Sequence, residues 1–407
     1  MIDYPSPVAS AATSPIDLRG ARDAVNFPHY LHLGSTIRGE SPASTLAKLQ
    51  WVMPAMGITR VANVTGLDHI GIPVALCIRP NAKHLSVSQG KGQTWELAKI
   101  SAIMEAIEGY HAENPQPSEL HGSYSQLQAH YPLAHPHLFS NNFFQMPDIA
   151  RWSLDWIRGH ELMTATEIYL PHALIHLDST RVQTEYGFFS VSSNGLAGGN
   201  TREEAICHGI YELIERDCIL RWQALTPAQQ QQTQLRLESI DSPGNQDLLA
   251  KFQQAQIDVK IWDISLASGI PAFIAEISDS NLLRGLQQFR GSGAHLVKDI
   301  ALSRALTEAA QSRLTLISGS RDDIFPAQYV RQKSFQTIEE TLGQRDYSHC
   351  VSPPLAHSFV ANLRFLLDHL RAQNFQQVFV VDHSRPEWNI PIVHVFIPGM
   401  KFNGHRI

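Results

Sequence analysis

Two segments of this chain combine a helical pattern of apolar residues with a row of carboxylates, and this combination restricts the fold more than any other feature. They are Ser101–Glu113 and Asn200–Asp217, and a glycine-rich stretch precedes each of them. In the first segment, Ser101, Glu105 and Glu108 fall at i, i+4 and i+7. Residues at these spacings share one narrow stripe of an α-helix. The sequence therefore predicts a helix with one acidic face.

The second segment repeats this arrangement at four positions that share one face of a helix: Glu204, His208, Glu212 and Glu215. The opposite face carries four aliphatic residues: Ile206, Ile210, Leu213 and Ile214. An apolar face of this kind must be buried against a core. This second helix is therefore expected to pack by one side and to present its carboxylates on the other.

Carboxylates stacked one turn apart on a helix repel one another, so a cation should compensate them. Mg²⁺ held by carboxylates together with the phosphates of a substrate is the usual solution. For a single helix of this type, a solvated acidic face is the simpler interpretation. The presence of two such helices, each after a glycine-rich stretch, favours a site for metal and phosphate.

The glycine-rich stretches, Ser88–Gly92 and Asn194–Gly199, are interpreted as turns that open the two helices. Neither has the GxxxxGK[ST] spacing of a phosphate loop or a close match to the dinucleotide fingerprint. Backbone N–H groups at a helix N-terminus can nevertheless face an anion. Asn200 is expected at the N-cap of the second helix, where it could contact a nucleotide or act only as a cap.

Composition excludes several classes of protein. A formal net charge of −6 gives no electrostatic case for nucleic acid or an anionic membrane as partner. The four cysteines form no CxxC pair, which favours free thiols in a reducing compartment. The N-terminus lacks a secretory signal, and no apolar run approaches the ~20 residues that span a bilayer. We therefore expect a soluble, cytoplasmic protein.

Predicted helices follow predicted strands repeatedly, which favours an α/β or α+β fold with mixed sheets. The expected strands are 59–64, 72–78, 188–192, 259–265, 271–277, 378–381 and 392–397, and further helices are expected at 299–316 and 359–371. Two glutamate-bearing helices after strands suggest a pseudo-symmetric core. The domain hypothesis is an N-terminal arm over 1–40, a catalytic domain over 41–400 with an insertion at about 114–160, and a tail over 401–407; residues 224–245 are expected to form a loop.

In combination, these residues resemble the YcaO family, whose members use ATP to phosphorylate a backbone amide oxygen of a peptide. The resemblance runs from about Leu46 to Pro398. Its motifs are Gly57-Ile58-Thr59-Arg60, Thr65-Gly66-Leu67-Asp68, Gly71-Ile72-Pro73-Val74, Ser88-x-Gly90-Lys91-Gly92, Ser101-x-x-x-Glu105-x-x-Glu108, Asn194-Gly195-Leu196-Ala197-Gly198-Gly199-Asn200-Thr201 and Glu212-Leu213-Ile214-Glu215-Arg216-Asp217.

The resemblance implies ATP and Mg²⁺ as cofactors and assigns roles to individual positions. The implied metal ligands are Glu105, Glu108, Glu204, Glu212 and Glu215. The implied nucleotide contacts are Arg38, Thr45, Lys91, Ser101, Asn200, Arg304 and Arg321. The implied catalytic residues are Glu212, Glu215 and Arg216. Phosphoryl transfer needs positioning and charge neutralisation, and these residue types supply both.

This sequence departs from the family pattern at two places. Gly109 stands where the first motif usually continues with Arg, and the chain lacks the PxPxP tail that azoline-forming cyclodehydratases carry. The second departure favours a thioamide product, made with a TfuA-type sulfur-delivery partner, over an azoline (thiazoline or oxazoline). Both products stay open, as does a cyclodehydratase that lost its tail carboxylate.

Recognition of the peptide substrate is expected to need a separate partner, either TfuA-like or a leader-binding protein similar to activating enzymes. The family resemblance implies a homodimer. A hypothesis from another class is a non-catalytic scaffold that binds nucleotide and a partner, since glutamate-rich helices alone could do so.

Overall fold

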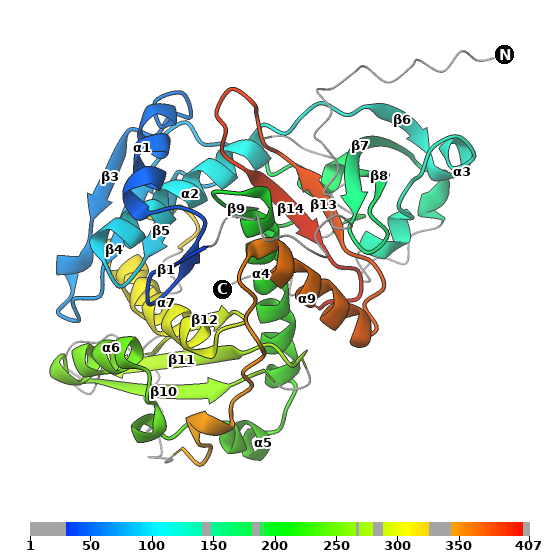
Figure 1. The fold of residues 1–407 in the computed structure, drawn as a ribbon. Coiled ribbons are helices and arrows are strands. Elements are labelled where there is room, and N and C mark those ends of the chain that lie inside the picture. The colour runs from blue at the N-terminus through cyan, green and yellow to red at the C-terminus, as the bar shows by residue number, and fades with distance from the viewer. Residues whose placement is uncertain are drawn as a thin grey trace. The chain divides into compact units, whose positions relative to one another are not determined.

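The structure, a computed structural model, describes residues 30–140, 148–180, 188–189, 191–265, 268–279, 288–324 and 343–401. Helices and strands are interspersed along it, so the predicted mixed α/β fold is confirmed (Figure 1). The expectation of mixed sheets was wrong, because the named strands of the described residues pair antiparallel. The chain divides into two compact units, each assembled from separate stretches of sequence. Among the described residues, unit 1 takes in Glu108–Ile210 and Ser358–Ile407, and unit 2 takes in His29–Ile107 and Tyr211–His357.

Unit 2 contains two antiparallel sheets that share one helix. The first sheet has the order β3 (Arg60–Asn63), β4 (Val74–Ile78), β5 (Val87–Lys91), and the second has the order β10 (Ile257–Asp263), β11 (Ala272–Asp279), β12 (Gln288–Ala294). Helix α7 (Lys298–Ser318) contacts strands of both sheets. Its alanine- and leucine-rich face is buried with Phe273, Ile261 and Phe252 in one core. The same helix therefore positions side chains relative to both sheets.

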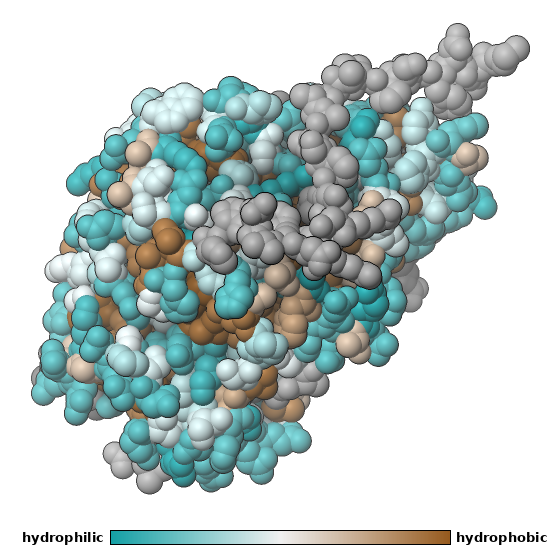
Figure 2. All heavy atoms as spheres, in the orientation of Figure 1, coloured by the Kyte–Doolittle hydropathy of each residue, from teal (hydrophilic) through white to brown (hydrophobic). Residues whose placement is uncertain are grey.

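The remaining elements of unit 2 include short strands, 3₁₀ turns and three helices, of which α6 contributes Phe252 to the core. They are β1 (Leu31–His32), β2 (Ile37–Arg38), α1 (Pro42–Val52), α5 (Pro227–Gln232), α6 (Pro243–Gln254) and 3₁₀ turns at Thr65–Leu67, Leu237–Ser239 and Tyr347–His349. Helix α1 begins where the Ser41 side chain accepts a hydrogen bond from the Ser44 N–H, with proline at the first helical position. Hydrophilic residues cover most of the molecular face seen in Figure 2.

Unit 1 is built on one sheet with the order β6 (Leu120–Ser123), β7 (Ser153–Glu161), β13 (Phe379–Asp382), β14 (Ile392–Phe396), β9 (Leu196–Gly198), and β8 (Thr166–Pro171) pairs with β7. Its core includes Trp156, Leu170 and Phe379. Helices α3 (Tyr124–Leu127) and α9 (Phe359–Ala372) belong to it, with 3₁₀ turns at Pro136–Phe139, Ile149–Arg151 and His172–Ile175. None of the helices in the described ranges is long and apolar enough to cross a membrane.

The two acidic segments form the helices that the sequence predicts. They are α2 (Trp95–Glu113) and α4 (Arg202–Gln223), and the four aliphatic residues predicted to face a core in α4 are all buried. Helix α2 starts before its predicted first residue, so Ser101 lies within the helix. Its residues up to Ile107 belong to unit 2, and α4 enters unit 2 at Tyr211.

The interpretation of Ser88–Gly92 as a turn was wrong, because most of this stretch forms strand β5. Glycine is needed here because the backbone of β5 lies very close to the backbone of α2. A Cβ built on Gly90 would lie 2.0 Å from the backbone nitrogen of Ala102 and 2.2 Å from the carbonyl oxygen of Ala98, both on α2. The glycine therefore lets a strand lie directly against the acidic helix.

Other differences from the sequence predictions lie in segments where apolar residues recur with neither a helical nor a strand period. The predicted strand near Phe188–Ser192 is represented by a single bridge between Phe189 and Ser140, and β9 forms inside the second glycine-rich stretch instead. The 114–160 segment contributes strands β6 and β7 to the sheet of unit 1, whereas 224–245 contains α5 and the start of α6. Residues 1–29 of the predicted arm over 1–40, and residues 402–407 of the tail, lie outside the described residues; the described part of the arm contains β1 and β2.

The contact between β12 and α7 gives a test of the fold. A Cβ on Gly291 would lie 2.2 Å from Ala309 N and 2.3 Å from Ala305 O, both backbone atoms that a side-chain rotation cannot move. Gly291→Ala should therefore lower the free energy of unfolding by about 3 kcal/mol. Urea unfolding followed by circular dichroism measures this. Gly66→Ala is the matched control, because nothing lies within 4 Å of its added Cβ; equal stability of both variants would contradict this packing.

Candidate functional site

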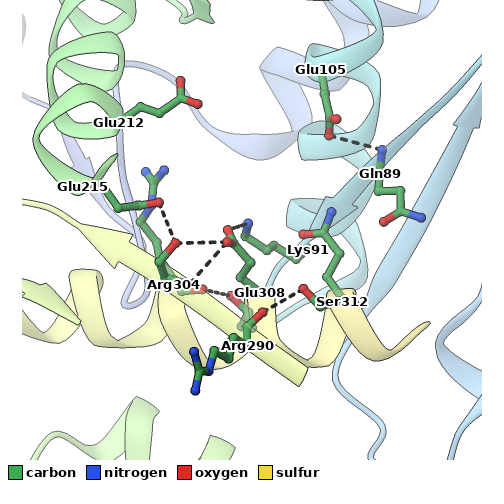
Figure 3. A network of polar contacts seen from close by, with 12 residues as sticks. Gln89, Lys91, Glu105, Glu212, Glu215, Arg290, Arg304, Glu308 and Ser312 are labelled. Atoms are coloured by element: carbon green, nitrogen blue, oxygen red, sulfur yellow. Dashed lines mark hydrogen bonds and ion pairs between the residues drawn. The ribbon is translucent and has the colours of Figure 1, made fainter. Parts of the chain in front are cut away.

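In unit 2, carboxylates from two helices point into the same space. Figure 3 shows the side chain of Glu212 extending from α4 into the space beside α2, where the carboxylate of Glu105 lies against Gln89. Glu105 accepts a hydrogen bond from the backbone N–H of Gln89 at 3.2 Å. Burial raises the pKa of Glu105, and the Glu212 carboxylate raises it further, whereas Arg321 and Lys91 lower it. Each predicted acidic face therefore contributes one carboxylate to this space.

Glu215, one turn further along α4, is fixed in place by three donors. The Ser292 hydroxyl donates to one carboxylate oxygen at 2.7 Å, and the Ala294 N–H donates to the other at 3.1 Å. The Arg216 guanidinium lies 3.3 Å away. Glu215 is 3% exposed, so this carboxylate is a rigid, buried anion. Its partners on β12 orient it before any ligand binds.

Glu308 on α7 joins this network; on the sequence it belongs to the charged cluster around this helix with Arg304 and Arg321, without an assigned role. It accepts hydrogen bonds from the Ser292 N–H at 3.3 Å and from the Ser292 hydroxyl at 3.2 Å, and it forms an ion pair with Lys91 (Figure 3). Although burial raises the pKa of Glu308, Lys91 and Arg216 hold it at about 2. A signal for it existed in the sequence: Glu308 lies one turn after the candidate Arg304 on a predicted helix.

Protein cations compensate the carboxylates in the described part of the chain. Lys91 pairs with Glu308, and Arg216 lies between Glu215 and Glu212, at 3.5 Å from the latter. Burial lowers the pKa of Arg216, but these carboxylates raise it by more. Arg321 pairs with Asp323 at 2.6 Å and also acts electrostatically on Glu105. The compensating charge that the sequence required is thus present in these side chains.

Three predicted residues of unit 1 contact one another or nearby backbone. Glu108 accepts a hydrogen bond from the Gly198 N–H at 2.6 Å. Glu204 is 1% exposed and accepts from the Asn200 N–H at 3.2 Å. The expected N-cap at Asn200 was wrong, because α4 starts at Arg202 and the Thr201 hydroxyl accepts the Glu204 N–H at 3.1 Å. Asn200 instead precedes the cap, with its amide directed at Glu204 (3.4 Å).

The other predicted nucleotide contacts lie on separate elements of unit 2. Arg38 ends β2, Thr45 is buried on α1, Ser101 is half-buried on α2 and Arg304 is half-buried on α7. Arg304 and Arg38 both act electrostatically on the buried His295, which follows β12. The structure therefore gathers Arg38 and Arg304 near one residue that the sequence analysis did not single out.

The donor set fits Mg²⁺ in the company of phosphate. Across the described ranges, no three His, Cys, Asp or Glu side chains are close enough to hold a metal by themselves. Mg²⁺ usually keeps several waters and takes one or two carboxylates together with substrate phosphates. Glu105 and Glu212 border the same space, and Lys91 and Arg321 act electrostatically on Glu105, so these side chains match that requirement. All four cysteines are free and buried.

Comparison with known proteins agrees with this chemistry. Residues 89–401 match the family model of the YcaO cyclodehydratases, which bind ATP and Mg²⁺. An uncharacterised protein of Methanothermobacter thermautotrophicus is 32% identical over 88% of this chain and 94% of its own length. An uncharacterised protein in the tfuA 3′ region of Rhizobium leguminosarum bv. trifolii is 32% identical over 89% of this chain and 88% of its own length.

Solved structures share the fold. A YcaO from Methanopyrus kandleri, bound with AMPPCP and Mg²⁺, has a TM-score of 0.71 and 19% identity, over 93% of this chain and 96% of its own. A heterocyclase in complex with substrate and cofactor has a TM-score of 0.72 and 22% identity over 90% of this chain. This chain spans about half (53%) of the heterocyclase. ATP and Mg²⁺ are thus the cofactors of this chain.

The Lys91–Glu308 pair predicts a pH-dependent stability. The pKa of Glu308 in the fold, about 2, is below its ordinary 4.5, so its stabilisation is complete above 4.5 and is lost as the pH falls from 4.5 toward 2. Lys91→Met should therefore lower the free energy of unfolding by about 2 kcal/mol at neutral pH, and by less below that window.

Thermal unfolding of both proteins between pH 3.5 and 8 measures this difference. Lys48→Met is the matched control, since Lys48 forms a more exposed ion pair with Glu40 and its loss should cost less than about 1 kcal/mol. A penalty for Lys91→Met that is the same at pH 3.5 and pH 7 would show that Glu308 does not carry the effect.

Proposed function

We propose that this chain, which belongs to the YcaO family, phosphorylates a backbone amide oxygen of a peptide or protein. The proposed product is a thioamide. Members of this family modify peptide backbones at the expense of ATP, with Mg²⁺. The observation that carries the proposal is the pair Glu105 and Glu212, which border one space and interact electrostatically, with Lys91 and Arg321 acting on Glu105 as cations. Such a site neutralises and orients a phosphate chain, as phosphoryl transfer demands.

The reaction has a simple chemical logic. An amide oxygen is a weak nucleophile, and hydroxide is a poor leaving group. Attack of the amide oxygen on the γ-phosphorus breaks the bond to ADP and places phosphate on that oxygen. A sulfur nucleophile then adds to the amide carbon, and the oxygen leaves as part of phosphate. The protein contributes orientation and electrostatic stabilisation, because no covalent help is required.

Each residue has a defined task in this proposal. In unit 2, Glu105, Glu212 and Glu215 are the proposed metal ligands, and Glu212, Glu215 and Arg216 are the proposed catalytic residues. The proposed nucleotide contacts of this unit are Lys91, Arg304, Arg321, Arg38, Thr45 and Ser101. In unit 1, Glu108 and Glu204 are proposed ligands and Asn200 a nucleotide contact. Bound Mg²⁺ would neutralise phosphate charge. Glu215 accepts a hydrogen bond from Ser292 and forms an ion pair with Arg216, and these contacts fix the positions of both side chains.

A separate protein is the proposed source of sulfur. The relative in the tfuA 3′ region supports a TfuA-like partner for this chain, and we further propose a homodimer. An azoline is the second candidate product, favoured by the likeness to a heterocyclase. In that case the attacking group comes from a side chain of the peptide. A leader-binding partner similar to activating enzymes would then replace the sulfur donor.

The site assignment is tested first by ATP hydrolysis. Glu212→Gln should reduce hydrolysis at least ~100-fold, because the carboxylate that borders the same space as Glu105 is lost from the metal–phosphate site. The fold should be kept, since neutralising one of these two carboxylates relieves repulsion. Glu203→Gln on the same helix is the control and should retain activity. Unchanged hydrolysis in a folded Glu212→Gln protein would contradict the site.

The product is tested by mass spectrometry after incubation of the protein with peptide, ATP and its candidate partner. A thioamide gains mass because sulfur replaces oxygen, whereas an azoline loses one water. Loss of water would overturn thioamide formation while keeping amide activation. An unchanged peptide with no ATP turnover above background, in every combination of partners, would favour the non-catalytic scaffold.

A further inference from the structure

His295 directly follows the last residue of β12, in the short connection to α7. It is 5% exposed, and its predecessor Ala294 holds Glu215 through the backbone N–H at 3.1 Å. Its ring packs against that of Tyr211, the residue before Glu212, with centroids 4.7 Å apart. Two contacts therefore tie the position of this imidazole to the glutamates of α4.

The hydrogen bonding of His295 fixes its tautomer. Nδ1 accepts the backbone N–H of Val297 at 2.9 Å. A nitrogen that accepts carries no proton, so in the neutral ring the proton resides on Nε2, which becomes a donor. The described residues offer Nε2 no hydrogen-bond partner. A buried ring with one nitrogen anchored and the other available as a donor is suited to hold an acceptor from a ligand.

The electrostatic surroundings of His295 favour an anion. Burial, followed by the charges of Arg304, Arg38 and His32, lowers the pKa of His295 well below its ordinary value, so the ring is neutral at neutral pH. Arg304 forms no ion pair with a carboxylate in the described part of the chain. A neutral N–H beside two guanidinium groups can donate a directed hydrogen bond to an anion. Because the imidazole is neutral, it places no third positive charge next to the two arginines.

We propose that His295 donates its Nε2–H to a phosphate oxygen of the bound nucleotide, beside Arg304 and Arg38. This inference rests on the proposed function, because it requires a nucleotide in unit 2. It assigns a ligand contact to a residue that neither the acidic helices nor the glycine-rich stretches indicate. Its recognition chemistry is that of an oxyanion held by one neutral and two charged donors.

Two substitutions separate this role from a structural one. In His295→Gln, the amide nitrogen can occupy the place of Nε2 and donate, but the acceptor for Val297 is lost. In His295→Asn, the amide oxygen can occupy the place of Nδ1 and accept from Val297, but the donor is lost. A ligand contact is rescued by Gln, whereas a purely structural role is rescued by Asn.

The experiment measures binding of ATP with Mg²⁺ by titration calorimetry, and thermal stability, for the full chain and both variants. We expect His295→Asn to bind ATP ~10–100-fold more weakly and His295→Gln to stay within about 5-fold of the parent protein. Binding by His295→Asn equal to the parent, or weaker binding by His295→Gln alone, would overturn the inference. Weaker binding that follows a loss of thermal stability in both variants would overturn it too.

The proposed function can fail separately from this inference. A parent protein that binds no ATP refutes the proposed function. A parent protein that binds and hydrolyses ATP, together with a fully active His295→Asn variant, refutes only the role of His295. The parent protein is therefore measured in the same series, before the variants are compared.

Discussion

The site in unit 2 depends on keeping several carboxylates ionised close together in a partly buried place. Removing a charge from water is costly, and mutual repulsion adds to the cost. The structure meets this cost with Lys91, Arg216 and Arg321, and with hydrogen bonds from Ser292 and the Ala294 backbone. These donors and cations lie on β5, β12 and α4, so they surround the carboxylates only when these elements are packed together. The ionised state of the carboxylates therefore depends on the folded arrangement of these elements.

The sequence predicted the acidic faces of α2 and α4 because helical periodicity and charge are both local properties. It also predicted strands β3, β4, β10 and β11 of unit 2, which are β-branched runs between turn residues, but it missed β1, β2 and β12. It misplaced β5, since a strand that contains two glycines has the composition of a turn. Ser292 was not predicted and Glu308 was given no role, because only the packing of α7 on β12 reveals what they contact.

Some side chains of this site are held in one orientation by the protein, whereas others have ion-pair partners that a ligand could replace. Glu215 is held by Ser292 and Ala294, so it has one orientation. Glu105 and Glu212 are half-buried and border the same space. Lys91 and Arg216 could transfer their pairing from carboxylate to phosphate, since both anions offer oxygen acceptors. A site of this kind is organised in advance, yet it can still exchange its internal cations for a ligand, which is what transfer of a charged group requires.

The glycines of β5 and β12 have a consequence for how such a protein can change over time. Gly90 brings its strand against the backbone of α2, and Gly291 does the same for α7. Backbone-to-backbone contacts leave no side chain whose size could be adjusted in small steps. The separation between each helix and its strand is therefore either kept or lost. Variation in substrate or product among relatives must then arise by exchanging whole residues on fixed helices or by adding partners, and not by gradual movement of the helices.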